Sequence, residues 1–396
     1  MRYVLMIPDG AADEPQDDLD GRTPLEAADT PHMDALATAG EVGLARTVPP
    51  EAEQPGSDVA CLSLLGYDPR QHYTGRGPLE AVSMDVDLGP ADVAFRCNLV
   101  TCGDDMTMVD YSAGEIPTPL AHQLMGIISD ALGEPKLRFY PGISYRHLLV
   151  WSDGPEATHT TPPHDILGQP IADHLPQGDG AETLQRLIYD SYGILRDVEI
   201  NRRLRDEGKH PANMIWPWGQ GRPLHLPAFA LRWGTPGLAV AAVDLVRGIA
   251  KAAGLAAPVI RGATGNLDTD FAAKGRAAAE ALERYPFVLV HVEAPDEASH
   301  HGDVEKKVWA LEQFDRHVVG QVVRALESLG PSRIMIAPDH PTPIRLRTHT
   351  KEPVPFLLAG PGVASDAADR FSETVAAESG LFVEDGTRLI ERLLRQ

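Results

Sequence analysis

Residues 287–303 read FVLVHVEAPDEASHHGD, a continuous apolar run followed directly by carboxylates and histidines. A short run of this kind is typical of a strand buried on both faces of a parallel sheet. Similar apolar runs occur at residues 3–7, 238–243, 333–337 and 354–359. We therefore expect a sheet of buried, parallel strands, with 287–292 as one of its members.

The segments between these runs have the spacing of amphipathic helices. Apolar residues recur at intervals of three and four in 244–255, 274–285 and 306–330. Strands that alternate with helices predict an α/β fold in which a doubly wound, mostly parallel sheet is covered on both faces.

The middle of the chain has a different pattern. It is rich in Pro, Gly and His, and its apolar runs, such as 89–102 and 143–151, are short and alternating. Alternation predicts antiparallel, half-solvated strands. We therefore expect a core formed by residues 1–85 and 223–396, and a smaller α+β domain formed by residues 86–222 inserted into it.

Composition excludes several classes of function. The 396 residues are enough for two domains, and the net charge of −22 argues against binding nucleic acid or an anionic membrane. The three cysteines form no CxxC pair, which argues against a disulfide framework and a thiolate zinc site. The N-terminus lacks the apolar core of a signal peptide, and no run reaches the ~18 apolar residues of a membrane span. We expect a cytoplasmic enzyme of undetermined oligomeric state.

Chemistry-bearing residues follow three of the predicted strands. They are Asp9 after 3–7, Asp296 and His300 after 287–292, and Asp339, His340 and the more distant His349 after 333–337. Each alone fits a turn, a helix cap or a solvated loop. Ligands of open parallel sheets bind at the carboxyl ends of strands, however, and carboxylate with imidazole suits Mn²⁺, Zn²⁺, Co²⁺ or Fe²⁺. The joint pattern predicts a metal site.

Ser57, in the segment PGSD at 55–58, precedes a predicted helix. The simplest interpretation is a helix N-cap, because Ser is among the best residues there. A metal site offers a second interpretation, because two divalent ions can activate a serine and hold the oxygens of a phosphoryl group. A helix N-terminus also favours a phosphate. We predict Ser57 to be the nucleophile.

Long motifs then match a known family from end to end. The motifs are GRTPLEAADTPHMDALATAGEVG (21–43), PGSDVACLSLLGYDP (55–69), YTGRGPLEA (73–81), DVAFRCNLVT (92–101), GATGNLDTDFAAK (262–274), VLVHVEAPDEASHHGDVEKKV (288–308) and APDHPTPIRLRTHTKEPVPF (337–356). The chain resembles the archaeal-type cofactor-independent phosphoglycerate mutases and their bacterial relatives, which belong to the alkaline phosphatase superfamily. The resemblance implies an alkaline-phosphatase-like core, and interconversion of 3-phosphoglycerate and 2-phosphoglycerate through a phosphoserine at Ser57.

The resemblance also implies two divalent ions and no requirement for 2,3-bisphosphoglycerate. Mn²⁺ is the expected metal, with Zn²⁺, Co²⁺ and Mg²⁺ as alternatives. One site would use Asp9, Ser57, Asp339 and His340, and the other Asp296, His300 and His349. Cys61, Ser299 and Pro341 depart from the usual residues of the family, but none of them removes a ligand.

The substrate is open at this point. The segments 211–229 and 339–343 resemble a branch that is proposed to include homoserine kinases, and a metal-dependent phosphatase of the same superfamily is a further alternative. The absence of a G-x-x-x-x-G-K-[ST] loop argues against a P-loop kinase.

A small phosphorylated substrate needs cationic partners. The candidates to bind its phosphate and carboxylate are Arg76, Arg96, Arg146, His164 and Lys307. Each could instead form an ordinary surface or interdomain salt bridge.

Overall fold

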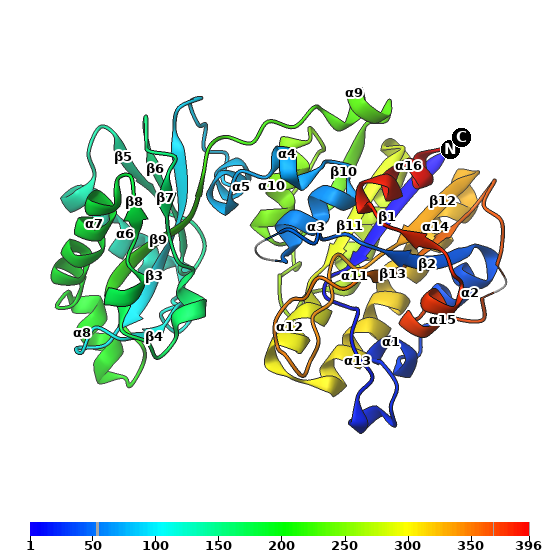
Figure 1. Cartoon of the computed structure of the whole chain (residues 1–396), viewed down its shortest axis with the longest axis horizontal. Helices are drawn as coiled ribbons and strands as arrows, with labels where there is room; N and C mark the ends of the chain where they lie inside the picture. Colours follow the sequence, from blue (N-terminus) through cyan, green and yellow to red (C-terminus); the bar gives the residue numbers. More distant parts are fainter. Residues whose placement is uncertain (53–54, 367, 396) are drawn as a thin grey trace. The chain divides into compact units, whose positions relative to one another are not determined.

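The computed structural model describes residues 1–52, 55–366 and 368–395. The chain divides into two compact units (Figure 1). The first comprises Met1–Tyr73 and His225–Gln396, and the second comprises Thr74–Leu224. The predicted α/β class with a mostly parallel sheet is confirmed.

The first unit is built on a seven-stranded sheet with the strand order β10-β11-β1-β12-β13-β2-β14. Its strands are β1 Arg2–Pro8, β2 Glu41–Ala45, β10 Gly237–Val240, β11 Phe287–Val292, β12 Ser332–Ile336, β13 Val354–Ala359 and β14 Phe382–Val383. The four strands β10, β11, β1 and β12 are mutually parallel. Strand β13 is antiparallel to β12 and β2, so the expectation that 354–359 is a parallel strand is wrong.

Helices cover both faces of this sheet. The helices are α1 Pro24–Ala27, α2 Pro31–Ala39, α3 Ser57–Leu64, α4 Pro69–His72, α9 Phe229–Trp233, α10 Asp244–Ala252, α11 Phe271–Arg284, α12 Ala294–His301, α13 Val304–Phe314, α14 Gly320–Leu329, α15 Glu373–Glu378 and α16 Leu389–Leu394. Val4, Met6 and Val290 share a core with α2, α11, α13 and α14, while α3 and α16 lie on the opposite face (Figure 1).

Three short helical segments complete the first unit. They are η1 Asp17–Leu19, η4 Asp315–Val319 and η5 Gly386–Arg388. Segment η4 is a π-helical turn between α13 and α14, so the single helix expected over 306–330 is locally widened. Within it, the carboxylate of Asp315 accepts the backbone N–H groups of His32 and Met33, which start α2. The widened turn thus anchors a neighbouring helix.

The second unit has its own sheet, in which β3 pairs antiparallel with β4, β6 and β9. The strands of this sheet are β3 Val93–Cys102, β4 Met108–Asp110, β5 Leu137–Tyr140, β6 Arg146–Trp151 and β9 Met214–Gly221. Strands β7 Thr158–His159 and β8 Gln177–Gly178 pair with each other in a separate sheet of the same unit. Its helices are α5 Arg76–Ser83, α6 Thr118–Leu132, η2 Pro163–Ile166, η3 Ile171–His174, α7 Ala181–Leu195 and α8 Glu199–Asp206. The antiparallel strands expected in this region are present.

The half-solvated character expected for these strands is wrong for β3, because every residue of β3 is buried. Phe95, Cys97 and Leu99 pack on α6 and α7, and Ala94 on the other face packs on Ala81 of α5. Helix α5 therefore groups with the second unit, whereas the predicted boundary at 85/86 falls on the other side of it.

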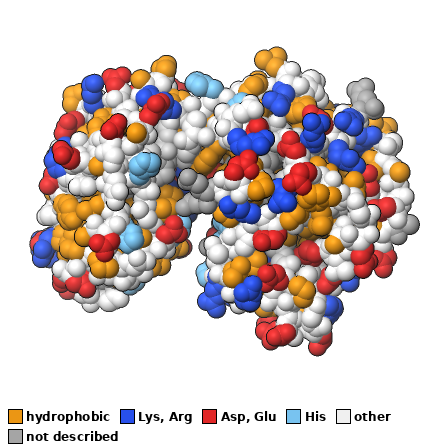
Figure 2. All heavy atoms as spheres, in the orientation of Figure 1, with side chains coloured by type: hydrophobic (Ala, Val, Ile, Leu, Met, Phe, Trp, Pro, Cys, Tyr) orange, Lys and Arg blue, Asp and Glu red, His pale blue; other side chains and the backbone are white. Residues whose placement is uncertain are grey.

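Acidic and basic side chains are interspersed on the face drawn in Figure 2. Among the described residues, no helix has both the length and the apolar character that crossing a membrane requires.

Candidate metal centre and arginine cluster

Three adjacent parallel strands end beside one another. Strand β1 lies between β11 and β12, with Ile7 opposite His291 and Met6 opposite Ile336. Asp9 follows β1, helix α12 follows β11, and Asp339 follows β12. Because carboxyl ends of parallel strands share one edge, the sequence-distant candidates come together there.

One cluster, which we call the histidine-pair group, consists of Asp296, His300 and His349. Nε2 of His300 lies 3.1 Å from Oδ2 of Asp296, and Nε2 of His349 lies 3.5 Å from Oδ1. The two Nε2 atoms are 3.0 Å apart. Their Nδ1 atoms face carbonyl oxygens, of Arg347 at 3.0 Å and of Pro55 at 2.8 Å. A carbonyl only accepts, so each Nδ1 donates to its carbonyl oxygen, and each Nε2 faces the carboxylate of Asp296. Burial opposes protonation of the two rings, but this carboxylate outweighs it and raises the pKa of both, that of His300 to about 9.

The second cluster, the aspartate-pair group, consists of Asp9, Asp339 and His340 beside Ser57. Nε2 of His340 lies 3.5 Å from Oδ1 of Asp9, 3.4 Å from Oδ2 of Asp339 and 3.1 Å from Oγ of Ser57. Oγ of Ser57 is also 3.4 Å from Oδ2 of Asp9. Asp9, Asp339 and His340 are buried, so their polar atoms have little access to water.

Thr342 joins the two groups. Its hydroxyl donates to Oδ1 of Asp296 at 2.5 Å, and its oxygen lies 3.2 Å from Nδ1 of His340. Because the hydroxyl has a single proton, Nδ1 of His340 is the donor in the second contact, and Nε2 of His340 presents a lone pair.

Ser57 is the first residue of α3, and Gly56 is its N-cap. The interpretation of Ser57 as the N-cap is therefore wrong, because the serine hydroxyl turns toward Asp9 and His340 instead of back to the helix. The helix N-terminus still lies at this position, which suits an anion.

The donor set fits divalent cations. Oδ1 of Asp9 and Oδ2 of Asp339 are buried without a hydrogen-bond partner in the described structure. Burial, together with the carboxylates of Asp339 and Asp296, raises the pKa of Asp9 well above its ordinary value. Buried, mutually repelling carboxylates that converge with imidazole lone pairs require a positive charge between them. Both groups can hold a metal ion.

A second set of predicted residues meets in the other unit. Arg96 of β3 lies opposite Trp218 of β9, and its neighbour Asn98 lies opposite Arg146 of β6. The guanidinium carbon of Arg96 is 5.1 Å from the Trp218 ring, and that of Arg76, at the start of α5, is 5.7 Å from it. We call Arg76, Arg96 and Arg146 the arginine cluster.

Tyr145 and His164 complete the surroundings of the arginine cluster. Arg146 lies over the ring of Tyr145 at 4.9 Å, and the ring of His164 contacts that of Trp218 edge-on at 5.4 Å. Four of the five predicted substrate-binding residues, Arg76, Arg96, Arg146 and His164, are thus gathered around two aromatic rings.

The arginine cluster is cationic. Glu80 lies 2.9 Å from Arg96 and 3.8 Å from Arg76, so two guanidiniums share one carboxylate. Nε of Arg76 is buried without a hydrogen-bond partner among the described residues. A site with surplus guanidinium donors is suited to a phosphate or a carboxylate.

Lys307 is separate from this cluster. It belongs to the first unit, is fully buried, and its Nζ contacts Oδ2 of Asp13 at 2.7 Å and the carbonyl oxygen of Thr342 at 3.0 Å. These contacts favour a structural role behind the metal centre over the predicted contact with substrate.

The chain is similar to other proteins along its whole length. A relative from Geobacter sulfurreducens, named a probable 2,3-bisphosphoglycerate-independent phosphoglycerate mutase, is 50% identical over 398 residues and covers 100% of both chains. This chain belongs to the 2,3-bisphosphoglycerate-independent phosphoglycerate mutase family. The model of that mutase family matches residues 37–201. The mutase 2 of Methanothermobacter thermautotrophicus is 49% identical over 396 residues, which are 100% of this chain and 97% of the relative.

Solved structures agree with the mutase assignment. A Pyrococcus horikoshii protein matches with a TM-score of 0.83 and 32% identity, over 99% of this chain and 97% of its own. The cofactor-independent phosphoglycerate mutase of Thermoplasma acidophilum matches with a TM-score of 0.65 and 26% identity, over 100% of this chain and 99% of its own. The predicted family and the isomerase class are confirmed, and the roles of single residues stay predictions.

Several buried polar residues beside the candidate metal centre were not predicted from the sequence. His291 and Glu293 lie beside Asp9, and Lys274 of α11 contacts both, with its Nζ 3.1 Å from Oε2 of Glu293. A histidine in the otherwise apolar run FVLVHV was the available signal. Thr342 gave no signal, because its role depends on Asp296, which is 46 residues away in the sequence and comes near only on folding.

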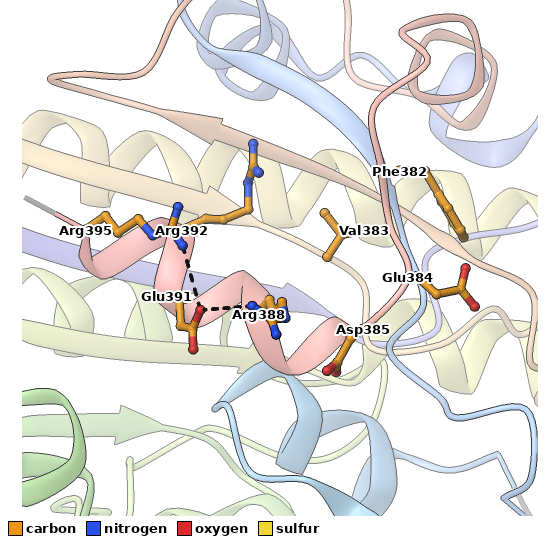
Figure 3. A pocket seen from close by; sticks show the side chains of 8 residues that line it. All are labelled: Phe382, Val383, Glu384, Asp385, Arg388, Glu391, Arg392 and Arg395. Carbon is orange, nitrogen blue, oxygen red and sulfur yellow. Dashed lines mark ion pairs between the residues drawn. The ribbon is translucent and has the colours of Figure 1, made fainter.

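A hollow of about 300 Å³ lies elsewhere in the first unit (Figure 3). Its lining residues are Phe382, Val383, Glu384, Asp385, Arg388, Glu391, Arg392 and Arg395. Arg392 pairs with Glu41 at 2.6 Å, and Arg388 and Arg395 both lie 3.9 Å from Glu391. Because these arginines already face carboxylates, and no predicted site residue lines the hollow, we assign it no part in the chemistry.

Proposed function

We propose that this chain interconverts 3-phosphoglycerate and 2-phosphoglycerate through a phosphoserine at Ser57. The observation that carries the proposal is the hydroxyl of Ser57, held 3.1 Å from Nε2 of His340 at the start of α3. A serine placed among unpaired carboxylate oxygens and imidazole lone pairs is in the environment that activates a nucleophile. Membership of the mutase family supports the choice of substrate.

The proposed centre binds two divalent ions, with Mn²⁺ foremost and Zn²⁺, Co²⁺ or Mg²⁺ as alternatives. Asp296, His300 and His349 would hold one ion, and Asp9, Ser57, Asp339 and His340 the other. Bound ions would lower the pKa of the serine hydroxyl and neutralise phosphoryl oxygens. No bisphosphorylated cofactor is required, and three free, buried cysteines fit a reducing, cytoplasmic setting.

In the first half-reaction, Ser57 loses its proton and Oγ bonds to phosphorus while the ester bond to glycerate breaks. The freed glycerate oxygen takes a proton. In the second half-reaction, the neighbouring glycerate hydroxyl loses its proton and its oxygen bonds to phosphorus, while the bond from Oγ of Ser57 to phosphorus breaks and Oγ takes a proton. Retention of the glycerate between the two steps makes the return transfer intramolecular, worth ~7–11 kcal/mol of barrier. The arginine cluster is our candidate for binding an anionic group of the substrate.

One experiment separates this mutase from its alternatives. The chain is incubated with Mn²⁺ and phosphate-labelled 3-phosphoglycerate in ¹⁸O-water with unlabelled free phosphate. The label is expected in 2-phosphoglycerate, without ¹⁸O in the phosphate. Release of ¹⁸O-phosphate at the rate of substrate loss would identify a phosphatase instead. If neither occurs but a supplied phosphoryl donor phosphorylates homoserine, the chain is a homoserine kinase.

Removal of the metal is the matching control. Exhaustive chelation, checked by elemental analysis, is expected to abolish turnover, and added Mn²⁺ or Co²⁺ to restore it. Full activity of metal-free protein would exclude the proposed centre.

A further inference from the structure

His291 is a buried polar residue that the predicted ligand sets leave unused. It is fully buried in β11, and its Nδ1 lies 3.0 Å from Oε1 of Glu293. Glu293 in turn accepts from Nζ of Lys274, which also donates to the carbonyl oxygen of His291 at 3.0 Å. Burial opposes ionisation of Glu293, but Lys274 and His291 lower its pKa to about 2.

The protonation of His291 follows from these partners. A carboxylate oxygen only accepts, so Nδ1 of His291 is the nitrogen that donates to Glu293, and Nε2 is the nitrogen left to bind an ion. This arrangement matches His300, His349 and His340, whose Nδ1 atoms are also committed to oxygen acceptors. A carboxylate behind the ring is a common support for a metal-ligating histidine.

Nε2 of His291 faces the proposed metal centre. Nε2 lies 3.3 Å from Oδ2 of Asp9 and has no hydrogen-bond partner in the described part of the chain. Ligand atoms of His291, Cys61 and Asp339 also lie within 4.8 Å of one another. Nε2 of His291 and Oδ2 of Asp9 thus converge on one buried point, where a single cation would contact both atoms.

We propose that His291 is a further ligand, through Nε2, of an ion bound by Asp9. This inference deepens the proposed function and rests on its metal centre. Two ligand atoms about 2.0–2.1 Å from one ion at a tetrahedral angle lie about 3.3 Å apart, which is the separation found here. Glu293 and Lys274 are positioning residues, because they fix the ring and its tautomer.

The chain provides a matched control in His147 of β6. It is also a fully buried strand histidine whose Nε2 lacks a hydrogen-bond partner among described residues. Its Nδ1, however, accepts the backbone N–H of Gly142 at 3.0 Å, and its charged neighbours are His122, Arg146 and Arg96. None of Asp9, Asp296 and Asp339 is among these charged neighbours in the described structure. The variant His147→Gln therefore tests the loss of a buried histidine alone.

The experiment measures metal binding by full-length wild type, His291→Gln, Glu293→Gln and His147→Gln. Mn²⁺ is titrated into each metal-free protein, free ion is followed by electron paramagnetic resonance, and the Co²⁺ forms are compared by visible absorption. In His291→Gln, the Kd of one ion is expected to rise at least 10-fold, with a changed Co²⁺ spectrum. Glu293→Gln is expected to have a smaller effect and His147→Gln none.

An unchanged Kd and Co²⁺ spectrum in His291→Gln would overturn the inference, because glutamine can replace a hydrogen-bond donor but is a poor ligand for these ions. If His291→Gln fails to fold, wild-type crystals grown with Mn²⁺ decide. An anomalous peak within about 2.3 Å of Nε2 supports ligation, and a distance above 3 Å excludes it. If wild type binds no Mn²⁺, the proposed metal centre fails together with this inference.

Discussion

The orientation of each histidine at the candidate metal centre is set by the hydrogen bond of its Nδ1 atom. The backbone carbonyls behind His300 and His349 and the hydroxyl behind His340 leave each Nε2 facing its metal group. Sequence spacing indicated Asp296 and His300 as a pair, because positions i and i+4 share a helix face. The histidine in the apolar run FVLVHV singles out His291 as unusual, but the sequence does not show whether its ring faces a ligand or packs in the core.

Ser57→Ala is expected to lower kcat about 10⁴-fold or more, because it removes the proposed nucleophile. Elemental analysis should still find bound metal, since Asp9, Asp339 and His340 remain. Ser63→Ala is the matched control, because Ser63 lies on the same helix and donates only to the carbonyl oxygen of Val59. Near-normal turnover in Ser57→Ala would contradict the assignment.

Arg96→Lys is expected to raise KM or lower kcat about 10-fold or more without loss of metal. Lysine keeps the positive charge and the pairing with Glu80, but it lacks the planar fork that binds an oxyanion with two N–H groups. Steady-state kinetics and elemental analysis measure the two effects. Arg138→Lys, at an exposed position in the same unit, should leave kcat and KM unchanged. If Arg96→Lys has the same kcat and KM as Arg138→Lys, Arg96 does not bind the substrate and its role is structural.

At the scale of elements, short connections place the site. Gly10 follows β1 with a φ of +60°, and a Cβ there would lie 2.5 Å from Oδ1 of Asp296 and 2.6 Å from Oγ1 of Thr342. The turn therefore needs glycine both for its backbone and for space. The apolar runs predicted the positions of β1, β11, β12 and β13, but not the reversed direction of β13. Direction depends on the path of the connecting loop, which apolar runs do not encode.

Gly10→Ala is expected to destabilise the fold and weaken metal binding. The left-handed backbone alone costs roughly 1–2 kcal/mol, and displacement of Asp296 should add to this. Gly21→Ala isolates the backbone effect, because Gly21 has a φ of +77° and nothing within 4 Å of the added Cβ. Thermal melts and Mn²⁺ titrations of both variants measure the difference. Equal metal affinity in the two would show that the turn does not shape the site.

Glu373 of α15 links the stability of the fold to pH. Its carboxylate accepts from Thr23 Oγ1 at 2.7 Å and from the backbone of Asp13 at 3.0 Å, and burial raises its pKa from 4.5 to about 7. The folded state therefore holds this proton more tightly than the unfolded state. Its contribution to stability is complete below pH 4.5 and is lost as pH rises to about 7.

Glu373→Gln removes that titration. As pH rises from 4.5 to 7.5, the free energy of unfolding of the variant is expected to increase relative to that of wild type by roughly 1–2 kcal/mol. This figure allows for the partial exposure of the side chain. Urea unfolding at several pH values measures the gain. Glu378→Gln, at an exposed position of the same helix, should follow the wild-type profile. A constant difference between Glu373→Gln and wild type across this range would refute the linkage.

At the scale of the whole molecule, composition and motifs predicted a chain of two domains. They did not predict that α5 belongs to the second of them. Helix α5 supplies Glu80 to the buried Arg96, and its Gly77 approaches the backbone of Ala94 so closely that a Cβ would lie 2.3 Å from that carbonyl oxygen. Pairings of this kind are not visible in a sequence pattern. We propose Thr74–Leu224 as the inserted domain in place of 86–222.

A fragment of residues 74–224 is expected to unfold cooperatively by itself, because it has its own sheet and hydrophobic core. A fragment of residues 86–222 should be less stable by about 3 kcal/mol or more, because it leaves Arg96 buried without Glu80. Circular dichroism melts compare the two. The proposed boundary is wrong if the shorter fragment is equally stable.

Thr74 and Arg222 are joined by a hydrogen bond of 2.8 Å between the threonine hydroxyl and the arginine carbonyl oxygen. For the folding of the first unit, the segment between Thr74 and Arg222 is equivalent to one long loop whose two ends lie next to each other. The entropy lost in closing such a loop grows only with the logarithm of its length, and the loop carries a core that offsets it. A change in the length of this segment therefore need not disturb the folding of the first unit, so the substrate binding that we propose for the segment and the phosphoryl chemistry that we propose for the first unit can change independently.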